Sequence, residues 1–182
     1  MTTSTGRTPA LIAVDGVAGP AIAAAARAAL TSIDRAARSG VSHWDASGLF
    51  EELAVADEST GQPSARTLLL LYAADLAFRL RWEIRPALAE GHSVVAAPYV
   101  DTAVAFGRAA GLGAAWLSNL FLFAPRPHAR RFADVSARAG RSRGGFVEFG
   151  CEYAGAANGV ARRELMDRMA AYLRARARRR AT

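Results

Sequence analysis

Residues 11–30, "LIAVDGVAGPAIAAAARAAL", decide the fold of this chain. The apolar run from Leu11 to Val14 predicts a buried strand, a glycine-containing turn follows from Asp15 to Pro20, and an alanine-rich helix comes next. Proline is well suited to the first turn of such a helix. Strand, glycine turn and helix in this order are the layout of a phosphate-binding loop, but the lysine that such a loop needs is absent.

The phosphate-handling positions of this loop are apolar. A working loop needs a second glycine so that backbone amides close on the phosphates, a lysine for the transferred phosphate, and a hydroxyl for magnesium. With the first glycine at Gly16, these positions fall on Ala21, Ile22 and Ala23. Because phosphoryl transfer depends on positioning and charge neutralisation, we expect no catalytic residue here. The loop positions that remain are Asp15, Gly16, Gly19, Ala21, Ile22 and Ala23.

The composition is that of one basic domain. The chain has 182 residues, a net charge of +7 and 23 basic residues, all of them arginine. Abundant alanine with arginine in place of lysine is typical of GC-rich coding, so part of the charge reflects codon usage. Either of two arginine clusters could meet an anion or form a solvated helix end, and without interleaved aromatic residues we expect no nucleic-acid partner. The clusters are Arg126, Arg130, Arg131, Arg138, Arg141 and Arg143, and Arg174, Arg176, Arg178, Arg179 and Arg180.

Targeting segments and metal sites are not expected. Arginines interrupt every apolar run before it reaches the roughly 18 residues that cross a bilayer, and the first ten residues lack the pattern of a secretory signal. We therefore expect a cytoplasmic protein without membrane contact, with a disordered leader at residues 1–9 and a single domain from 10 to 182. One cysteine, Cys151, and three scattered histidines give no zinc spacing, so no metal site is expected.

Strand and helix patterns alternate along the chain. This alternation predicts an α/β fold, a three-layer open parallel sheet with helices on both faces. The predicted strands are 11–14, 41–44, 93–100, 130–135 and 146–149, and the predicted helices are 20–38, 49–55, 65–90, one starting at 102, 114–124 and 160–179.

The predicted helix from Ala65 to Glu90 is apolar around most of its circumference. Only a narrow polar strip of Asp75, Arg79 and Glu83 interrupts it. A helix of this kind must be buried on two sides, so we expect one side to pack on the sheet and the other on another subunit.

Residues 10–136 resemble a known family. "IAVDGVAGPAIA" (12–23) is similar to the first strand and P-loop of thymidylate kinases, and residues 68–117 resemble the central helix, catalytic strand and following helix of that family. "RPHARRFADVS" (126–136) is similar to a later strand. The resemblance implies a P-loop NTPase fold, dimerisation through the 65–90 helix, and an ancestral transfer of phosphate from ATP to dTMP. The segment from 135 to 146 is shorter than the family's lid region, which puts an arginine clamp from this chain in doubt.

The family's functional side chains are mostly replaced here. Its Asp-Arg-Tyr motif falls on Ala97, Pro98 and Tyr99, while the arginine and glutamine after "YAAD" fall on Leu76 and Phe78. An apolar lining at these positions would stabilise the fold and forfeit phosphate binding. The remnant nucleoside-pocket positions are Tyr72, Leu76, Phe78, Ala97, Pro98, Tyr99, Asp101 and Phe106.

Several of these residues have a structural alternative. Tyr72, Tyr99 and Phe106 either line a residual pocket or pack in the core, and Asp101 either binds a ligand or caps the following helix.

Four functions follow from this sequence. The first is a catalytically inactive thymidylate-kinase-like protein that acts as a homodimer through the Ala65 to Glu90 helix or as a heteromer with another protein. The second is a small-molecule or nucleoside-binding protein that reuses the old cleft. The third is an atypical dTMP kinase, and only this alternative requires ATP and magnesium. The fourth, nucleic-acid binding, rests on charge alone.

Overall fold

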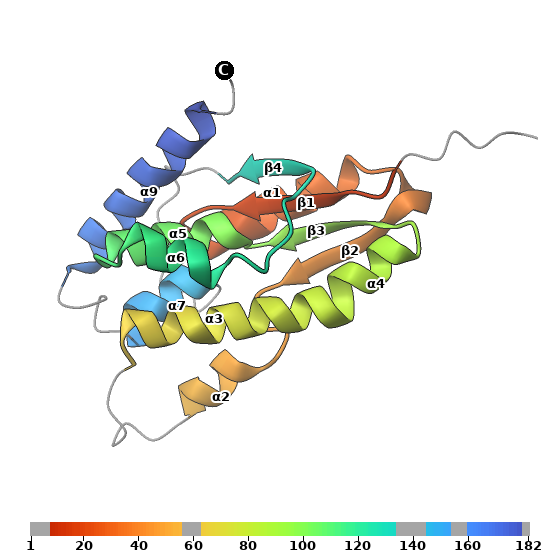
Figure 1. Cartoon of the computed structure of the whole chain (residues 1–182). Coiled ribbons are helices and arrows are strands. Elements are labelled where there is room, and N and C mark those ends of the chain that lie inside the picture. The colour runs from red at the N-terminus through yellow and green to blue at the C-terminus, as the bar shows by residue number, and fades with distance from the viewer. Residues whose placement is uncertain (1–7, 56–62, 134–144, 154–159, 180–182) are drawn as a thin grey trace, which may run out of the picture.

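The computed structural model of the chain describes residues 8–55, 63–133, 145–153 and 160–179. These residues include a four-stranded parallel sheet in the order β2-β3-β1-β4, with helices on both faces (Figure 1). The strands are β1 (Leu11–Asp15), β2 (Arg38–His43), β3 (Ser93–Ala97) and β4 (Ala129–Phe132). The predicted open parallel sheet in three layers is confirmed.

Helices cover the two faces of the sheet unequally. On one face α1 (Gly19–Thr31) packs against Ile12 and Val14, and on the other α3 (Ala65–Arg79) and α5 (Val100–Ala109) pack against Leu11 and Ala13. α9 (Arg162–Arg178) lies on α5 (Figure 1). The remaining helices are α2 (Leu49–Val55), α4 (Arg85–Ala89), α6 (Ala114–Leu120) and α7 (Phe146–Tyr153).

The two central strands, β1 and β3, are the ones that the apolar runs in the sequence predicted most directly. Every residue of β1 and β3 is buried, as expected of parallel strands covered on both faces, and Ile12 pairs with Val95 at the centre. Within the predicted strand 93–100, β3 ends at Ala97, where the sequence already indicates a turn at Pro98, because proline has no N–H to continue the ladder. The last helix, α9, is confirmed over nearly its whole predicted length.

The predicted strand at 146–149 is wrong. Phe146–Tyr153 form the helix α7, and residues 145–151 are buried throughout. A short run that is buried on every side shows no hydrophobic periodicity by which a strand could be distinguished from a helix. In the helix Phe146 and Phe149, three residues apart, reach one aromatic cluster.

The first helix is shorter than predicted. α1 ends at Thr31. A 3₁₀ turn at Arg35–Ala37 follows, in which the Ala36 N–H donates to the Asp34 carboxylate, and this turn leads into β2 at Arg38. The predicted helix therefore ended about seven residues too late, and the second strand starts earlier than predicted. α6 also stops before the predicted end, at Leu120.

The long helix at 65–90 is confirmed, and it is apolar on two sides as predicted. α3 continues through a π-helical turn at Leu80–Ile84 into α4. Tyr72 and Leu76 are buried in the core, whereas Leu70, Phe78 and Trp82 are 51 %, 39 % and 62 % exposed. Asp75 and Arg79, from the polar strip, are 0 % exposed, while Glu83 is exposed. The helix thus carries apolar side chains on an inner and an outer face, and it buries a charged pair.

Some predicted features have no described counterpart. The leader at 1–7, the polar residues 56–62 and the arginines at 138, 141, 143 and 180 lie outside the described residues. Within the described ranges, no helix is long and apolar enough to cross a membrane. The same ranges contain no group of three or more His, Cys, Asp or Glu side chains arranged to hold a metal ion.

Candidate functional site

The loop between β1 and α1 is held by hydrogen bonds within the protein. The Gly16 N–H donates to Thr102 Oγ1 at 3.0 Å, and that hydroxyl donates to the Gly16 carbonyl at 3.1 Å. A Cβ at Gly16 would lie 2.9 Å from Ala133 Cβ and 2.9 Å from Ile22 Cγ1, so only glycine fits this close approach. The loop therefore keeps its glycine for packing, while its amide is already used by α5.

The first turn of α1 carries no group that could hold a phosphate. Ala18 precedes the helix without a side-chain cap, and Ala21 and Ala23 follow as partly buried methyl groups. Ile22 is buried and packs in the core on the α1 side of the sheet. Binding an anion here would depend on the backbone alone.

The start of α1 already has an anion, the carboxylate of Glu148 from α7. Glu148 Oε1 accepts a hydrogen bond from the Gly19 N–H at 2.8 Å, where the helix dipole favours negative charge. Burial raises the pKa of Glu148, and its second oxygen, Oε2, is buried without a hydrogen-bond partner. Gly145 allows this approach, because a Cβ there would lie 2.9 Å from Gly19 Cα. α7 therefore contacts the loop directly and places a carboxylate at its helix terminus.

The same helix completes a cluster of aromatic side chains beside the loop. The Phe146 ring lies 4.6 Å from Tyr72 and 5.1 Å from Phe106, measured between ring centroids. Phe149 lies 5.2 Å from Phe50 and 5.9 Å from Trp44. Edge and tilted arrangements of this kind are favourable ring contacts. Tyr72 and Phe106, two of the three aromatic residues with an open alternative, are buried in the core, as is the third, Tyr99.

Asp15 links the loop to the end of β3. Its Oδ1 accepts hydrogen bonds from the Tyr99 N–H at 3.0 Å and the Thr102 N–H at 2.9 Å, while Oδ2 is buried without a partner. Burial, with a further contribution from the nearby charge of Asp101, raises the pKa of Asp15 from 3.8 to about 6. The Asp15 carboxylate thus links the loop to the end of β3, although burying it in the ionised form destabilises the folded state.

The raised pKa of Asp15 predicts a pH-dependent stability. Below pH 4 the group is protonated in both states. Between pH 4 and 6 the unfolded chain releases the proton first, so stability falls as pH rises and levels off above pH 6, at a cost of about 3 kcal/mol. Asp15→Asn cannot ionise, and its amide oxygen can still accept from Tyr99 and Thr102.

Urea unfolding at pH 4, 5, 6 and 7 checks this prediction. The stability of Asp15→Asn relative to the wild type should rise by about 3 kcal/mol from pH 4 to pH 7. A difference that stays constant over this range would contradict it.

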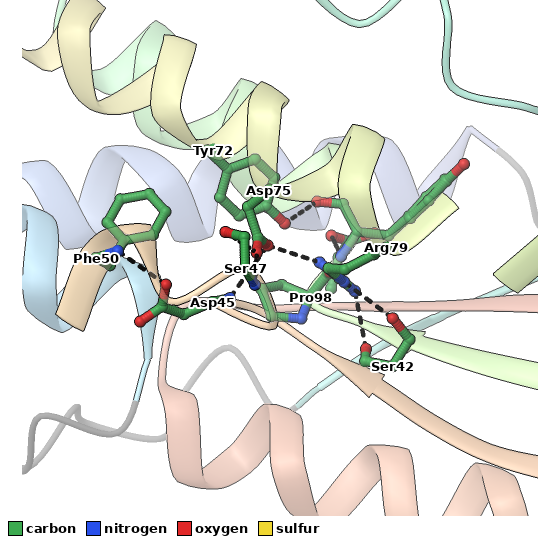
Figure 2. Close-up of polar contacts among 10 residues, drawn as sticks. Ser42, Asp45, Ser47, Phe50, Tyr72, Asp75, Arg79 and Pro98 are labelled. Carbon is green, nitrogen blue, oxygen red and sulfur yellow. Dashed lines mark hydrogen bonds and ion pairs between the residues drawn. The ribbon is translucent and has the colours of Figure 1, made fainter. Parts of the chain in front are cut away.

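A second polar network lies under α3 (Figure 2). Arg79 donates from Nε to Ser42 Oγ at 3.0 Å and from Nη2 to the carbonyls of Ser42 at 2.8 Å and Pro98 at 3.0 Å. Its Nη1 lies 3.8 Å from Asp75 Oδ2, close enough for an ion pair but without a hydrogen bond. The arginine thus joins α3 to the ends of β2 and β3.

Asp75 organises the loop that follows β2. It accepts from the Asp45 N–H at 3.1 Å, the Ser47 N–H at 3.0 Å and the Ser47 hydroxyl at 2.9 Å (Figure 2). Asp45, at a φ of 59°, in turn accepts from the N–H groups of Phe50 and Glu51 and so caps α2. The sequence pattern did not identify Arg79 as a buried residue. The signal was an acid and an arginine four residues apart on a helix that is otherwise apolar.

The structure brings most of the predicted positions together, with two exceptions. Leu76, Ala97 and Pro98 are buried near the loop, and Tyr72 donates to the Tyr99 carbonyl at 2.6 Å. Phe78 lies apart, on the exposed face of α3.

Asp101 is the second exception. The predicted cap is wrong, because Tyr99 occupies the N-cap position of α5 and the Asp101 carboxylate pairs with Arg130 at 2.8 Å and Arg176 at 2.9 Å.

A small cavity remains between the phosphate loop and the end of β3. Its volume is about 220 Å³, below the range of most small-molecule sites. The lining includes Gly19, Ile22 and Ala23 from the loop and Ala97 and Pro98 from the old Asp-Arg-Tyr positions. Among the described residues of this lining His43 is the only titratable one, and burial followed by the charge of Arg79 lowers its pKa. Apart from His43, the described lining side chains are apolar.

Comparisons with known proteins agree on one relationship. The chain is 37% identical over 84 residues to a probable thymidylate kinase of Pyrococcus abyssi and 38% identical over 84 residues to that of Pyrococcus horikoshii, in both cases 44% of this chain and 41% of the relative. A probable thymidylate kinase of Pyrobaculum calidifontis is 36% identical over 66 residues, 36% of this chain and 34% of the relative. The chain thus spans less than half the length of the curated relatives it matches.

The fold comparison extends further along the chain. The crystal structure of thymidylate kinase from Ehrlichia chaffeensis matches with a TM-score of 0.58 at 14% identity, over 70% of this chain and 72% of that one. At this identity the likeness shows a shared fold. No family model matches the sequence.

Proposed function

We propose that this chain, a relative of the thymidylate kinases with the same P-loop-type α/β fold, transfers no phosphate and acts by association through the exposed face of α3. The observation that carries the first half is the Glu148 carboxylate at 2.8 Å from the Gly19 amide. A triphosphate needs this amide and this helix terminus. Phosphate and carboxylate repel each other, and no lysine or arginine of the loop offsets that repulsion.

The nucleoside side of the cleft supports the same proposal. Rings from α7 fill the space beside Tyr72 and Phe106, and the cavity that remains, about 220 Å³, has an apolar lining. An unpaired phosphate in such an environment loses its hydration without gaining partners. The nucleoside-binding and dTMP kinase alternatives would both require α7 to leave this position.

The outer face of α3 supports association. Leu70, Ala74, Phe78 and Trp82 follow one another at spacings of four residues, and all four are exposed. Arg81 lies over the Trp82 ring, 5.0 Å from its centroid, and adds a cation–π contact at the edge of this row. An apolar row with an aromatic anchor and an arginine is typical of a protein interface. Because the row is a continuous helix surface, it can pair with its own copy, and we assign it to a homodimer.

Isothermal titration tests the catalytic half of the proposal. Mg-ATP and dTMP, titrated separately into the full chain, should give no binding heat, and a coupled assay with both should give no turnover. Turnover above background would overturn the proposal in favour of an atypical kinase. Binding of dTMP or thymidine alone would overturn it in favour of a nucleoside-binding protein.

Light scattering after size-exclusion chromatography tests the association. We expect a dimer at micromolar concentration, and Phe78→Glu/Trp82→Glu should convert it to a folded monomer because both side chains are exposed and contribute little to the core. Ala28→Glu, at an exposed position of α1 on the opposite face of the sheet, is the matched control and should remain dimeric. A wild-type monomer, or a dimer unaffected by the double substitution, would contradict this interface.

A further inference from the structure

A larger cavity is lined by residues of α5, α6, the segment before β4 and α9. Its volume is about 590 Å³, within the usual range of small-molecule sites. None of its charged residues is a family phosphate-binding position that the sequence resemblance identified.

Tertiary structure assembles a positive charge at this cavity from distant parts of the chain. Arg108 comes from the end of α5, Arg126 and Arg130 from the segment around β4, and Arg176 from α9. Among the described residues of the lining Asp101 is the only acidic one, so four arginines against one carboxylate give these residues a net charge of +3. Arg126 and Arg130 of the first arginine cluster and Arg176 of the second thus line one cavity.

Asp101 orients two of these arginines without using them up. Its Oδ2 accepts from Arg130 Nη1 at 2.8 Å and its Oδ1 accepts from Arg176 Nε at 2.9 Å, and the carboxylate is buried. A guanidinium has five N–H donors, so each arginine keeps most of its donors for another acceptor. Arg108 and Arg126 make no hydrogen bond or ion pair with any other described residue.

The rest of the lining is apolar with hydroxyl groups. Val104, Phe121 and Leu122 contribute apolar side chains, and Ser118 and Tyr172 contribute hydroxyls. Leu122 is 80 % exposed.

We propose that this cavity binds a small organic anion, in which a phosphate monoester or carboxylate is attached to a flat apolar body. The forked donors of the arginines match the oxygens of either anion, and the apolar side chains of the lining contact the body. Inorganic anions satisfy only the first feature and neutral rings only the second. The arginines of this site are not among the old phosphate-binding positions, although Tyr99 and Asp101 in its lining are remnant nucleoside-pocket positions.

NMR chemical-shift titration of the full-length chain tests the proposal with four probes. These are phenyl phosphate, benzoate, inorganic phosphate and benzyl alcohol. At least one of the two aromatic anions should bind more tightly than both inorganic phosphate and benzyl alcohol, with shifts at the amides of Ser118 and Tyr172. Which aromatic anion binds better identifies the anionic group, and either result supports the site. No binding of either, or inorganic phosphate binding as tightly as both, would overturn it.

Matched variants show whether the cavity itself binds the probe. Arg108→Ala/Arg126→Ala should weaken binding at least tenfold, whereas Arg163→Ala/Arg174→Ala, which removes the same charge from exposed positions of α9 outside the lining, should change it less than twofold. Equal losses of affinity in both variants would show that binding depends only on the overall charge of the protein, and would overturn the proposal. Leu122→Glu, at a side chain too exposed to affect folding, adds a repelling carboxylate and should also abolish binding. Unchanged binding in this variant would count against the site independently of the arginine substitutions.

Discussion

Arg79→Met should lower the free energy of unfolding by about 3–5 kcal/mol, the usual cost of breaking a buried charged contact from one side. The guanidinium is fully buried and its three hydrogen bonds join α3 to Ser42 and Pro98. Methionine fills similar space but leaves the two carbonyls and one hydroxyl without a donor. Asp75 keeps its three bonds to the loop after β2, yet it loses the neighbouring positive charge.

Chemical denaturation of three variants checks this prediction. Arg81→Met lies two residues further along, on an exposed side chain whose main contact is the Trp82 ring, and should cost less than about 1 kcal/mol. Arg79→Lys should recover only part of the loss, because an ammonium group lacks the fork that reaches Ser42 and Pro98 together. A methionine variant as stable as the Arg81 control would show that the network contributes little.

The second large effect is expected for Phe146→Ala, at about 3–5 kcal/mol. The Phe146 ring is buried and contacts the rings of Tyr72, Phe106, Phe50 and Trp44, with centroid distances from 4.6 to 6.4 Å. Its removal leaves a cavity between elements that cannot close in, because α3, α5 and α7 each have other contacts. Thermal and urea unfolding measure the loss.

Phe123→Ala is the control for this prediction. That ring is 41 % exposed, so its removal should cost less than about 1 kcal/mol. If the two alanine variants were equally stable, α7 would not pack on the aromatic cluster. The proposal that α7 fills the old nucleoside side of the cleft would then lose its physical basis.

The sequence predicted the parts of the fold that have one dominant physical signal. β1 and β3 are apolar runs between turn residues, and strands of this kind are central in a parallel sheet. The 65–90 helix is too long to be a strand. The absence of a lysine and of a hydroxyl at residues 21–23 could also be read directly from the sequence.

Where burial removes periodicity, local patterns failed. Residues 146–149 could be strand or helix, and only the packing of α7 on Gly19 and the aromatic cluster decides between them. No local pattern indicated that the Asp75 and Arg79 part of the polar strip is buried. It is buried because the loop after β2 and the end of β3 supply partners that lie 19 to 37 residues away along the chain.

The sequence by itself determined the order of strands and helices outside residues 146–149, and the absence of a lysine and a hydroxyl in the loop, since both depend on neighbouring residues. Only tertiary structure decided that Glu148 contacts the Gly19 amide at that loop, that one apolar row of α3 faces outward, and that distant arginines share one cavity. These features arise from contacts between segments far apart in the chain, and such contacts leave no local pattern to read.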